Sequence, residues 1–470
     1  MGTECNGKRM RFQGLFGREV VGKFDGGSIT SDAGGLLLRE VERATKIIGQ
    51  FAACFRDYRD RESVEHTVYD LVAQRVYGLA LGYEDLNDHD ELRRDPLLAV
   101  LVGKGDPLGE DRLRAQDRGK ALAGKSTLNR LELTPAEASE KSRYKKIVVD
   151  QEAVDRFFVN VFLQSYETAP EEIVLDVDAT DDPLHGRQEG RFFHGYYRCY
   201  CYLPLYVFCG EHLLCARLRE SGIDASHGAV EELSRIVGQI RERWPQTKIV
   251  IRGDSGFCRE ELMSWCEGEK GVDYLFGLAK NSRLIESIES ELEEARVEFE
   301  RSGSAARVYK EFRYSTLESW SRERRVIGKA EHLSKGSNPR FVTTSLSGGE
   351  AGRVYERYCA RGEMENRIKE QQLYLFADRT STAKFRGNQI RLSFSSVAYV
   401  LVHGLRRLGL RGTKLSRAQA HTIREKLLKI GAQIRVTVRK VWISLAGGYP
   451  YEEVFRRVMA NLRGVRPLRC

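Results

Sequence analysis

The sequence lacks the features that define several classes of protein. No apolar run in its 470 residues approaches the roughly 18 residues that a membrane-spanning helix needs. The stretch MGTECNGKRMRFQG at residues 1–14 has no apolar segment of the kind found in signal peptides, so we expect a cytoplasmic protein. The ten cysteines include no C-x-x-C pair, which argues against a zinc ribbon and favours reduced cysteines.

Acidic residues are scarce in one part of the chain only. Residues 381–470 contain 19 lysines and arginines but only three acidic residues, Glu425, Glu452 and Glu453. The remainder carries 57 basic and 64 acidic residues, so the net charge of +9 arises in the last 90 residues. A concentrated basic segment is typical of a protein that binds a polyphosphate, although a solvated basic face without a partner has the same composition.

The hydrophobic pattern changes several times along the chain and predicts an α/β protein. We expect one helix over 353–375 and one strand over 433–446. The predicted regions are a mostly helical N-terminal part (1–165), the first part of a mixed α/β core (170–284), a β-rich insertion (285–350), a helical segment that completes the core (351–410) and a basic C-terminal part (411–470).

Carboxylates gather at the ends of two predicted strands. In IVLDVDATDD, Asp176 and Asp178 are two residues apart and so project to one face of a strand. Asp254 ends a second strand in KIVIRGDSGF, where Gly253 and Gly256 favour a sharp turn. If the two strands are neighbours, Asp178 and Asp254 lie side by side and repel each other. Oxygen ligands at this density favour Mg²⁺ or Mn²⁺.

A polar stripe follows in YCARGEMENRIKEQQ, residues 358–372. Five polar residues recur in it every three or four positions: Tyr358, Arg361, Glu365, Lys369 and Gln372. This spacing places them on one face of a helix. A stripe of one phenol, two cations and a carboxylate suits a metal ion and a phosphate better than a hydrophobic core. A solvated surface helix with a Glu–Lys pair is the alternative interpretation.

Taken in order, these motifs resemble the DDE transposases of bacterial insertion sequences. The resemblance is carried by DATDDPLHGRQEG, YLPLYVF, RGDSGF and YCARGEMENRIKE, and it is strongest over residues 170–410. The Tyr-x-x-Arg-x-x-x-Glu spacing is similar to the branch that has a β-rich insertion before the catalytic glutamate. This resemblance implies an RNase H-like α/β core and a transposase that cuts and pastes DNA.

The resemblance also implies roles for individual residues. Asp178, Asp254 and Glu365 match the catalytic triad, which would hold two Mg²⁺ or Mn²⁺ ions. Asp176, earlier on the same strand, would support these ligands without binding the ions directly. Tyr358 and Arg361 match positions that grip the DNA end. The lysine that often follows the glutamate by seven residues is replaced by Gln372, and Lys369 is the candidate substitute. The implied partners are terminal inverted repeats, target DNA and a second copy of the chain.

Three further positions are candidate DNA contacts. Trp320, flanked by arginines in the predicted insertion, could stack on an unpaired base or could pack in the small core of a hairpin. Arg406 and Arg407 are candidate phosphate contacts in the basic C-terminal part. The N-terminal helices could recognise the ends of the element, but no helix there has a clear recognition pattern.

Other interpretations of the same residues remain open. IVLDVDAT also fits the first motif of haloacid-dehalogenase-type phosphatases, in which Asp176 would be the nucleophile and Asp178 the acid and base. A DNA-binding protein without catalysis would keep the basic segment and would not need the triad. An RNase H-like nuclease would use the triad to cut DNA without transposing it.

Overall fold

The computed structural model describes residues 9–466, and the first part of the stretch examined for a signal peptide lies outside them. It divides into two compact units, unit 1 (Met1–Val148 with Val397–Cys470) and unit 2 (Val149–Ser396). Within the described residues, no helix is both long and apolar enough to cross a membrane, and the cysteines there are free thiols.

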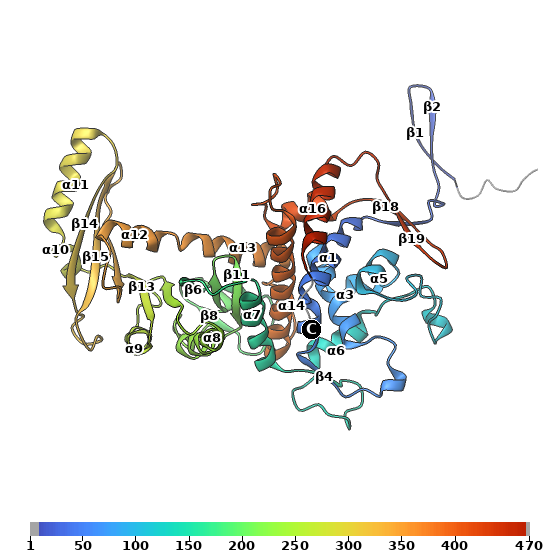
Figure 1. Cartoon of the computed structure of the whole chain (residues 1–470), viewed down its shortest axis with the longest axis horizontal. Helices are drawn as coiled ribbons and strands as arrows, with labels where there is room; N and C mark the ends of the chain where they lie inside the picture. Colours follow the sequence, from blue (N-terminus) through green and yellow to red (C-terminus); the bar gives the residue numbers. More distant parts are fainter. Residues whose placement is uncertain (1–8, 467–470) are drawn as a thin grey trace, which may run out of the picture. The chain divides into compact units, whose positions relative to one another are not determined.

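Unit 2 is built on a mixed sheet of nine strands (Figure 1). Its main strand order is β11-β10-β6-β12-β13-β17-β15-β14, and β16 pairs only with β15. The bounds are β6 (Glu172–Ala179), β10 (Leu205–Cys209), β11 (His212–Arg217), β12 (Lys248–Gly253), β13 (Val272–Leu278), β14 (Ala306–Tyr314), β15 (Arg324–Leu333), β16 (Gly336–Ser337) and β17 (Arg340–Thr344). A small separate sheet contains β7 (Asp182–Pro183), β8 (Phe192–His194) and β9 (Cys199–Tyr202).

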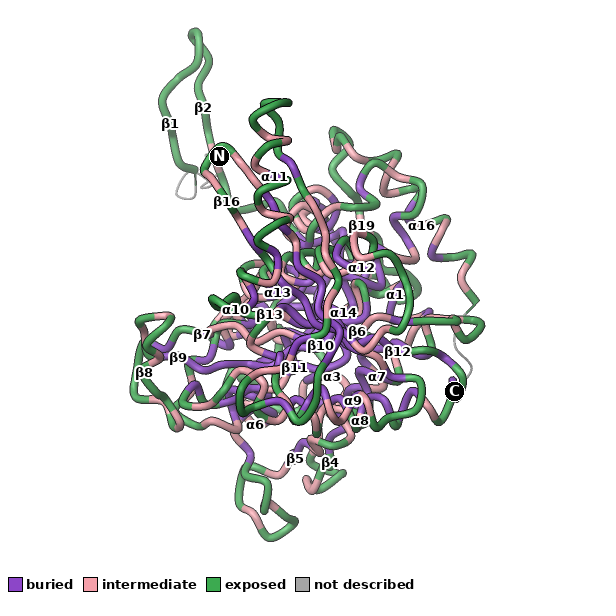
Figure 2. The backbone as a smooth tube through the Cα atoms, turned by 90° about the vertical axis from the view of Figure 1, so that its left-hand side faces the viewer, coloured by how far each residue is buried: buried purple, intermediate pink, exposed green. Residues whose placement is uncertain are grey.

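Helices cover both faces of this sheet. The helices of unit 2 are α7 (Gln151–Gln164), α8 (Ala229–Arg243), α9 (Glu260–Gly268), α10 (Ser282–Glu286), α11 (Glu289–Ser302), α12 (Ala351–Cys359), α13 (Gly362–Leu375) and the first part of α14 (Phe385–Gly404). One face packs its apolar side chains against α7, α8 and α9. The opposite face packs against Val354 and Tyr355 of α12. Figure 2 shows that the central strands of the sheet are buried.

The alternation of β6 follows from these two faces. Ile173, Leu175 and Val177 belong to the larger apolar core, because successive residues of a strand point to opposite faces. Asp176 and Asp178 therefore point to the other face, where α12 and α13 lie. A strand that looks uniformly buried in the sequence thus has one apolar face and one functional face.

The predicted β-rich insertion does not form a sheet of its own. β17 pairs antiparallel with β13, and β15 and β14 follow it, so the insertion widens the core sheet. The inner order, with antiparallel β11 and β10 beside parallel β6, β12 and β13, fits an RNase H-like core.

Unit 1 combines the two ends of the chain. Its N-terminal elements are β1 (Met10–Leu15), β2 (Arg18–Gly22), β3 (Ser28–Thr30), α1 (Leu36–Thr45), α2 (Ile47–Ala52), β4 (Phe55–Asp57), α3 (Val68–Leu81), α4 (His89–Leu92), α5 (Pro96–Val102), α6 (Lys125–Leu133) and β5 (Ile147–Val149). Its C-terminal elements are a π-helical turn (Leu405–Gly409), α15 (Ala420–Ile423), a second π-helical turn (Arg424–Leu428), β18 (Ala432–Val436), β19 (Val441–Leu445) and α16 (Glu452–Gly464). β18 pairs with β3, and α16 packs on α1.

Several predicted boundaries differ from those of the structure. The basic C-terminal part shares a unit with the N-terminal part, because strand pairing joins β3 to β18 across most of the sequence. α7, predicted in the N-terminal region, contributes Phe162 to the core of unit 2. The strand predicted over 433–446 is a hairpin, since Thr437 and Lys440 close a turn between β18 and β19.

Candidate active site

The two candidate aspartates lie at the same end of neighbouring strands. β6 and β12 run parallel, and the last aligned pair in their register is Val177 with Gly253. Asp178 and Asp254 are the next residues of the two strands. They therefore sit side by side at the carboxyl edge of the sheet, where open α/β sheets place their sites.

The Asp178 carboxyl is poorly solvated and close to other negative charges. Its side chain is only 15% exposed. Burial, together with the charges of Asp254 and Glu365, raises the pKa of Asp178 to about 7, although Arg361 and the Ala179 amide oppose this shift. Two carboxylates that disfavour each other's ionisation are stabilised in their charged form by a cation between them.

Crowding, and not a special backbone conformation, explains the glycines beside Asp254. Neither Gly253 nor Gly256 has a positive φ. A Cβ at Gly253 would lie 3.0 Å from Val177 and 3.1 Å from Phe257, so a side chain there would force the strands apart. The Gly256 amide donates to Asp254 Oδ1 at 2.8 Å. The turn therefore fixes the direction of the Asp254 carboxylate.

The predicted helix over 353–375 is divided into α12 and α13. The Arg361 amide donates to the Tyr358 carbonyl, and the Met364 amide donates to the Arg361 carbonyl, each at 3.0 Å. These tight turns carry the chain from one helix into the next. Because Arg361 itself has helical φ and ψ, the stripe of functional side chains continues across the junction.

Arg361 links the stripe to the strand ends. Its Nη1 lies 3.5 Å from Asp178 Oδ2, and its Nη2 lies 2.8 Å from Glu365 Oε1. The guanidinium thus places positive charge between two of the three candidate carboxylates. Among the described residues, no three acidic, histidine or cysteine side chains are arranged to hold a metal ion. Carboxylate oxygens suit Mg²⁺ or Mn²⁺. In this structure the Arg361 guanidinium supplies the positive charge beside the Asp178 and Glu365 carboxylates.

Comparison with known proteins identifies the family of the chain. The family model described as "Transposase DDE domain group 1" matches residues 12–467. The chain belongs to this family of DDE transposases. A solved structure of the piggyBac transposase synaptic complex with hairpin DNA is similar at a TM-score of 0.40 and 12% identity, over 94% of this chain and 86% of that chain. No curated protein sequence matches significantly. The family confirms the predicted transposase function, and the sheet confirms the mixed α/β fold.

The phosphatase interpretation is excluded by the family and by the position of Asp176. That side chain is buried and accepts two hydrogen bonds from Arg252, from Nε at 2.5 Å and from Nη2 at 2.8 Å. A carboxylate held in this way is neutralised by its partner and cannot reach a substrate. In the transposase, the ion pair between Asp176 and Arg252 joins β6 to β12, two residues before Asp178.

A glycine that the motif search missed makes room for Tyr358. A Cβ at Gly277 in β13 would lie 2.5 Å from the Tyr358 hydroxyl, so only glycine allows the phenol to lie against the sheet. Burial raises the pKa of Tyr358, and the charge of Asp254 contributes to the same shift. A glycine inside the apolar strand DYLFGLA is a recognised sign of a close approach and could have revealed this contact.

The two candidates for the missing lysine have different environments. Gln372 is half-buried, and its Nε2 donates to the Asp181 carbonyl at 3.0 Å, which ties α13 to the segment that follows β6. Lys369 is exposed on the same helix. Gln372 therefore has a structural contact within the transposase, and Lys369 presents its charge to solvent.

Two of the remaining candidate DNA contacts are buried in the transposase. Trp320 belongs to the core of unit 2, packs edge-on against Tyr314 at 5.8 Å and lies under Arg324. In this structure Trp320 is therefore a core residue and is not positioned to stack on a base. Arg406 is buried in unit 1 and donates to the Ala418 carbonyl at 2.9 Å, while Arg407 is half-buried.

Proposed function

We propose that this transposase binds the ends of an insertion sequence and then cleaves and joins DNA strands with Asp178, Asp254 and Glu365. The observation that carries the proposal is the parallel register of β6 and β12, which sets the two aspartates side by side. Arg361 contacts both Asp178 and Glu365 and so connects the glutamate to the strand ends.

The three carboxylates would hold two Mg²⁺ or Mn²⁺ ions. When bound, two such ions activate a water or a 3′-hydroxyl for attack on a phosphodiester and stabilise the leaving oxygen. The raised pKa of Asp178 supports this role, because its cause is an excess of negative charge that a divalent cation relieves.

Tyr358, Arg361 and Lys369 would hold the DNA end. Arg361 is the cation nearest to the triad and has the planar fork that suits a phosphate. When metal ions neutralise the carboxylates, its guanidinium is available for the DNA backbone. Lys369 is exposed further along the same helix, where it can contact the next part of the strand.

The transposase would act as a homodimer on double-stranded DNA, because both ends of an element must be cut together. Its substrates would be the terminal inverted repeats, and its product would be joined to target DNA. We place this reaction in the bacterial cytoplasm, at the nucleoid, where both DNA substrates are found.

The test uses the DNA that naturally flanks the gene. These flanks are placed around a marker on a supercoiled plasmid, and excision is measured with Mg²⁺ and with EDTA. We expect excision by the wild type and by Glu363→Gln, which alters an exposed residue of the same helical turn. We expect none with Glu365→Gln or with EDTA.

Other results would select a different function. Cutting without rejoining to the target, still dependent on Glu365, would indicate a nuclease. DNA binding without cutting by either the wild type or the variants would indicate a catalytically silent DNA-binding derivative.

A further inference from the structure

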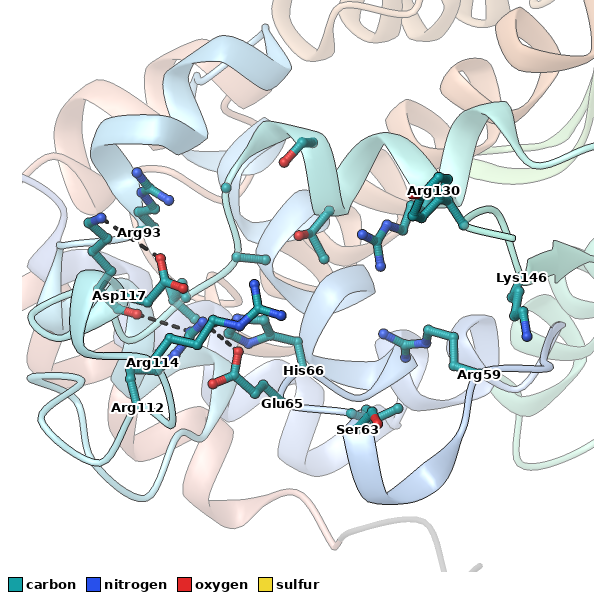
Figure 3. Close-up of a pocket in the computed structure, with 18 of the residues that line it drawn as sticks. Arg59, Ser63, Glu65, His66, Arg93, Arg112, Arg114, Asp117, Arg130 and Lys146 are labelled. Atoms are coloured by element: carbon teal, nitrogen blue, oxygen red, sulfur yellow. Dashed lines mark hydrogen bonds and ion pairs between the residues drawn. The ribbon is translucent and has the colours of Figure 1, made fainter. Parts of the chain in front are cut away.

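Unit 1 contains a cavity of about 530 Å³ that is lined by eight basic and three acidic residues (Figure 3). The lining comes from segments far apart in the sequence, between Arg59 after β4 and Lys146 before β5. Only Arg143 and Lys146 come from a basic run in the sequence, KSRYKK at residues 141–146, so the concentration of charge arises mainly from folding. We call this cavity the basic pocket.

Several of its arginines are not committed to ion pairs in the described part of the chain. Arg59 is paired with Asp57, and Arg112 is paired with Glu65, each at 2.8 or 2.9 Å. Arg114 and Arg130, by contrast, form no ion pair within residues 9–466. Figure 3 shows that their guanidinium groups, from opposite sides, point into the same space. Positive charge that the protein leaves unpaired is available to a negatively charged ligand.

Hydrogen-bond donors without acceptors accompany these charges. Arg112 Nη1 lies 2.7 Å from His66 Nε2, and since an arginine can only donate, Nε2 must accept and Nδ1 must carry the hydrogen. His66 is buried, and burial, aided by Arg112, lowers its pKa to about 3, so the ring stays neutral. Neither His66 Nδ1 nor Arg112 Nε has an acceptor in the described part of the chain.

The first turn of α6 also faces the basic pocket. Ser126 and Thr127 line it, and Gly124, the residue before the helix, has no side chain, so the Lys125 amide donates to Asp90 Oδ1 at 3.0 Å instead. A Cβ at Gly124 would lie 2.9 Å from an Asp90 oxygen, so the site has no room for a capping residue. The positive end of a helix dipole favours an anion with several oxygen atoms.

From the unpaired arginines, the unsatisfied donors and the helix dipole, we infer that the basic pocket binds phosphate groups of the duplex DNA backbone. This inference rests on the proposed function and adds to it a second DNA contact, in a unit that does not contain the triad. Arg114 is exposed, so the backbone of a long duplex can reach the pocket. Phosphate contacts position a duplex without reading its bases.

The test measures DNA binding in EDTA, where strand cutting does not interfere. Fluorescence anisotropy is recorded with a labelled duplex of the flanking sequence and with an unrelated duplex, over a range of salt concentrations. The variants are Arg114→Ala, Arg130→Gln and the two combined in the full-length protein. Arg118→Ala is the matched control, since Arg118 is exposed in the same segment but does not line the pocket.

We expect each pocket variant to weaken binding of both duplexes by about threefold to tenfold and to lower the salt slope by about one. The control should bind like the wild type, and thermal melting should be unchanged for all of them. Equal losses in the control and in the pocket variants would overturn the inference and point to general electrostatic attraction.

Two more outcomes would overturn the inference, and they separate it from the proposed function. Wild-type binding that the pocket variants do not alter, with inorganic phosphate bound tightly in calorimetry, would assign the pocket to a free phosphate compound and leave the transposase reaction intact. A wild type that binds no DNA at all would overturn both.

Discussion

Two of the clusters of carboxylates and arginines in unit 2 are built in opposite ways. The proposed active-site cluster has three carboxylates, Asp178, Asp254 and Glu365, and Arg361 contacts two of them. In the second cluster, which we call the brace, Arg324 binds Glu260 at 2.6 Å and Glu267 at 2.8 Å. Arg322 adds a further ion pair with Glu267.

The pKa shifts of the two clusters differ in sign. In the brace, hydrogen bonding to Arg324 lowers the pKa of Glu260 to about 2. In the active site, burial and neighbouring carboxylates raise the pKa of Asp178 to about 7. Paired charges hold α9 to the start of β15, whereas surplus charge requires a cation from outside. The comparison separates charges that stabilise the fold from charges that we propose serve the reaction.

The largest expected effect is on catalysis. Asp254→Asn should lower the rate of strand cleavage by about 10³-fold or more, because a lost metal ligand removes several kcal/mol of transition-state stabilisation. Glu260→Gln in the brace should leave the rate within a few-fold of the wild type. Single-turnover cleavage of a labelled duplex measures both. Similar rates for the two variants would contradict the distinction between the clusters.

The brace should dominate stability instead. Arg324 has only 2% of its side chain exposed, so Arg324→Met leaves Glu260 without its ion-pair partner and Glu267 with Arg322 alone, and it should lower the free energy of unfolding by about 3 kcal/mol. Arg322→Ala, with 58% of the side chain exposed, should lower it by less than about 1 kcal/mol. Urea denaturation followed by circular dichroism measures both, and equal losses would show that burial does not set the contribution.

How much of this contrast could be predicted depends on how far apart the residues lie. The three carboxylates of the proposed triad could be singled out because each lies in a local motif, at a strand end or on a helix stripe, and the family resemblance assigned them to one site. The brace was not, since Glu260, Glu267 and Arg324 meet only after the insertion joins the core sheet. The charged residue in the buried strand KIVIRGD, Arg252, was a signal for a buried pair, but its partner Asp176 was evident only from the strand register.

Two failures of prediction have the same physical cause. The helix over 353–375 was predicted as one element because a single tight turn at Arg361 leaves the apolar period unchanged. The strand over 433–446 was predicted as one element because its alternation continues through the turn at Thr437 and Lys440. Periodicity reports which face is buried, and it does not report where the chain changes direction.

A carboxyl in unit 1 tests whether a raised pKa alone indicates a reactive site. Glu42 accepts hydrogen bonds from the Ile48 amide at 2.7 Å and the Gly49 amide at 3.0 Å, and burial raises its pKa to about 7. Because the folded pKa exceeds the unfolded value of 4.5, its contribution to stability is present below pH 4.5 and is lost as the pH rises to about 7.

The prediction therefore concerns the difference in the free energy of unfolding between the wild type and Glu42→Gln. The stability of the wild type relative to Glu42→Gln should fall by about 2 kcal/mol between pH 5 and pH 8, while cleavage at a fixed pH should be the same in both. Urea denaturation at each pH measures the first quantity. A constant difference in stability would show that Glu42 is ionised throughout, and a loss of cleavage would assign it a functional role.

The smallest expected effect concerns the helix that carries Glu365. Lys369→Ala should weaken binding of the DNA end by about threefold and lower the salt slope by about one, because one phosphate contact is lost. Gln372→Ala should leave the salt slope unchanged, since Gln372 donates to the Asp181 carbonyl and carries no charge. Instead, it should slow cleavage modestly by loosening the segment that follows Asp178. Anisotropy titrations in EDTA and single-turnover cleavage distinguish the two positions. If the salt slope changes in the Gln372 variant and not in the Lys369 variant, the phosphate contact belongs to the position of the missing lysine, and the surplus charge of the active site then extends one turn further along α13.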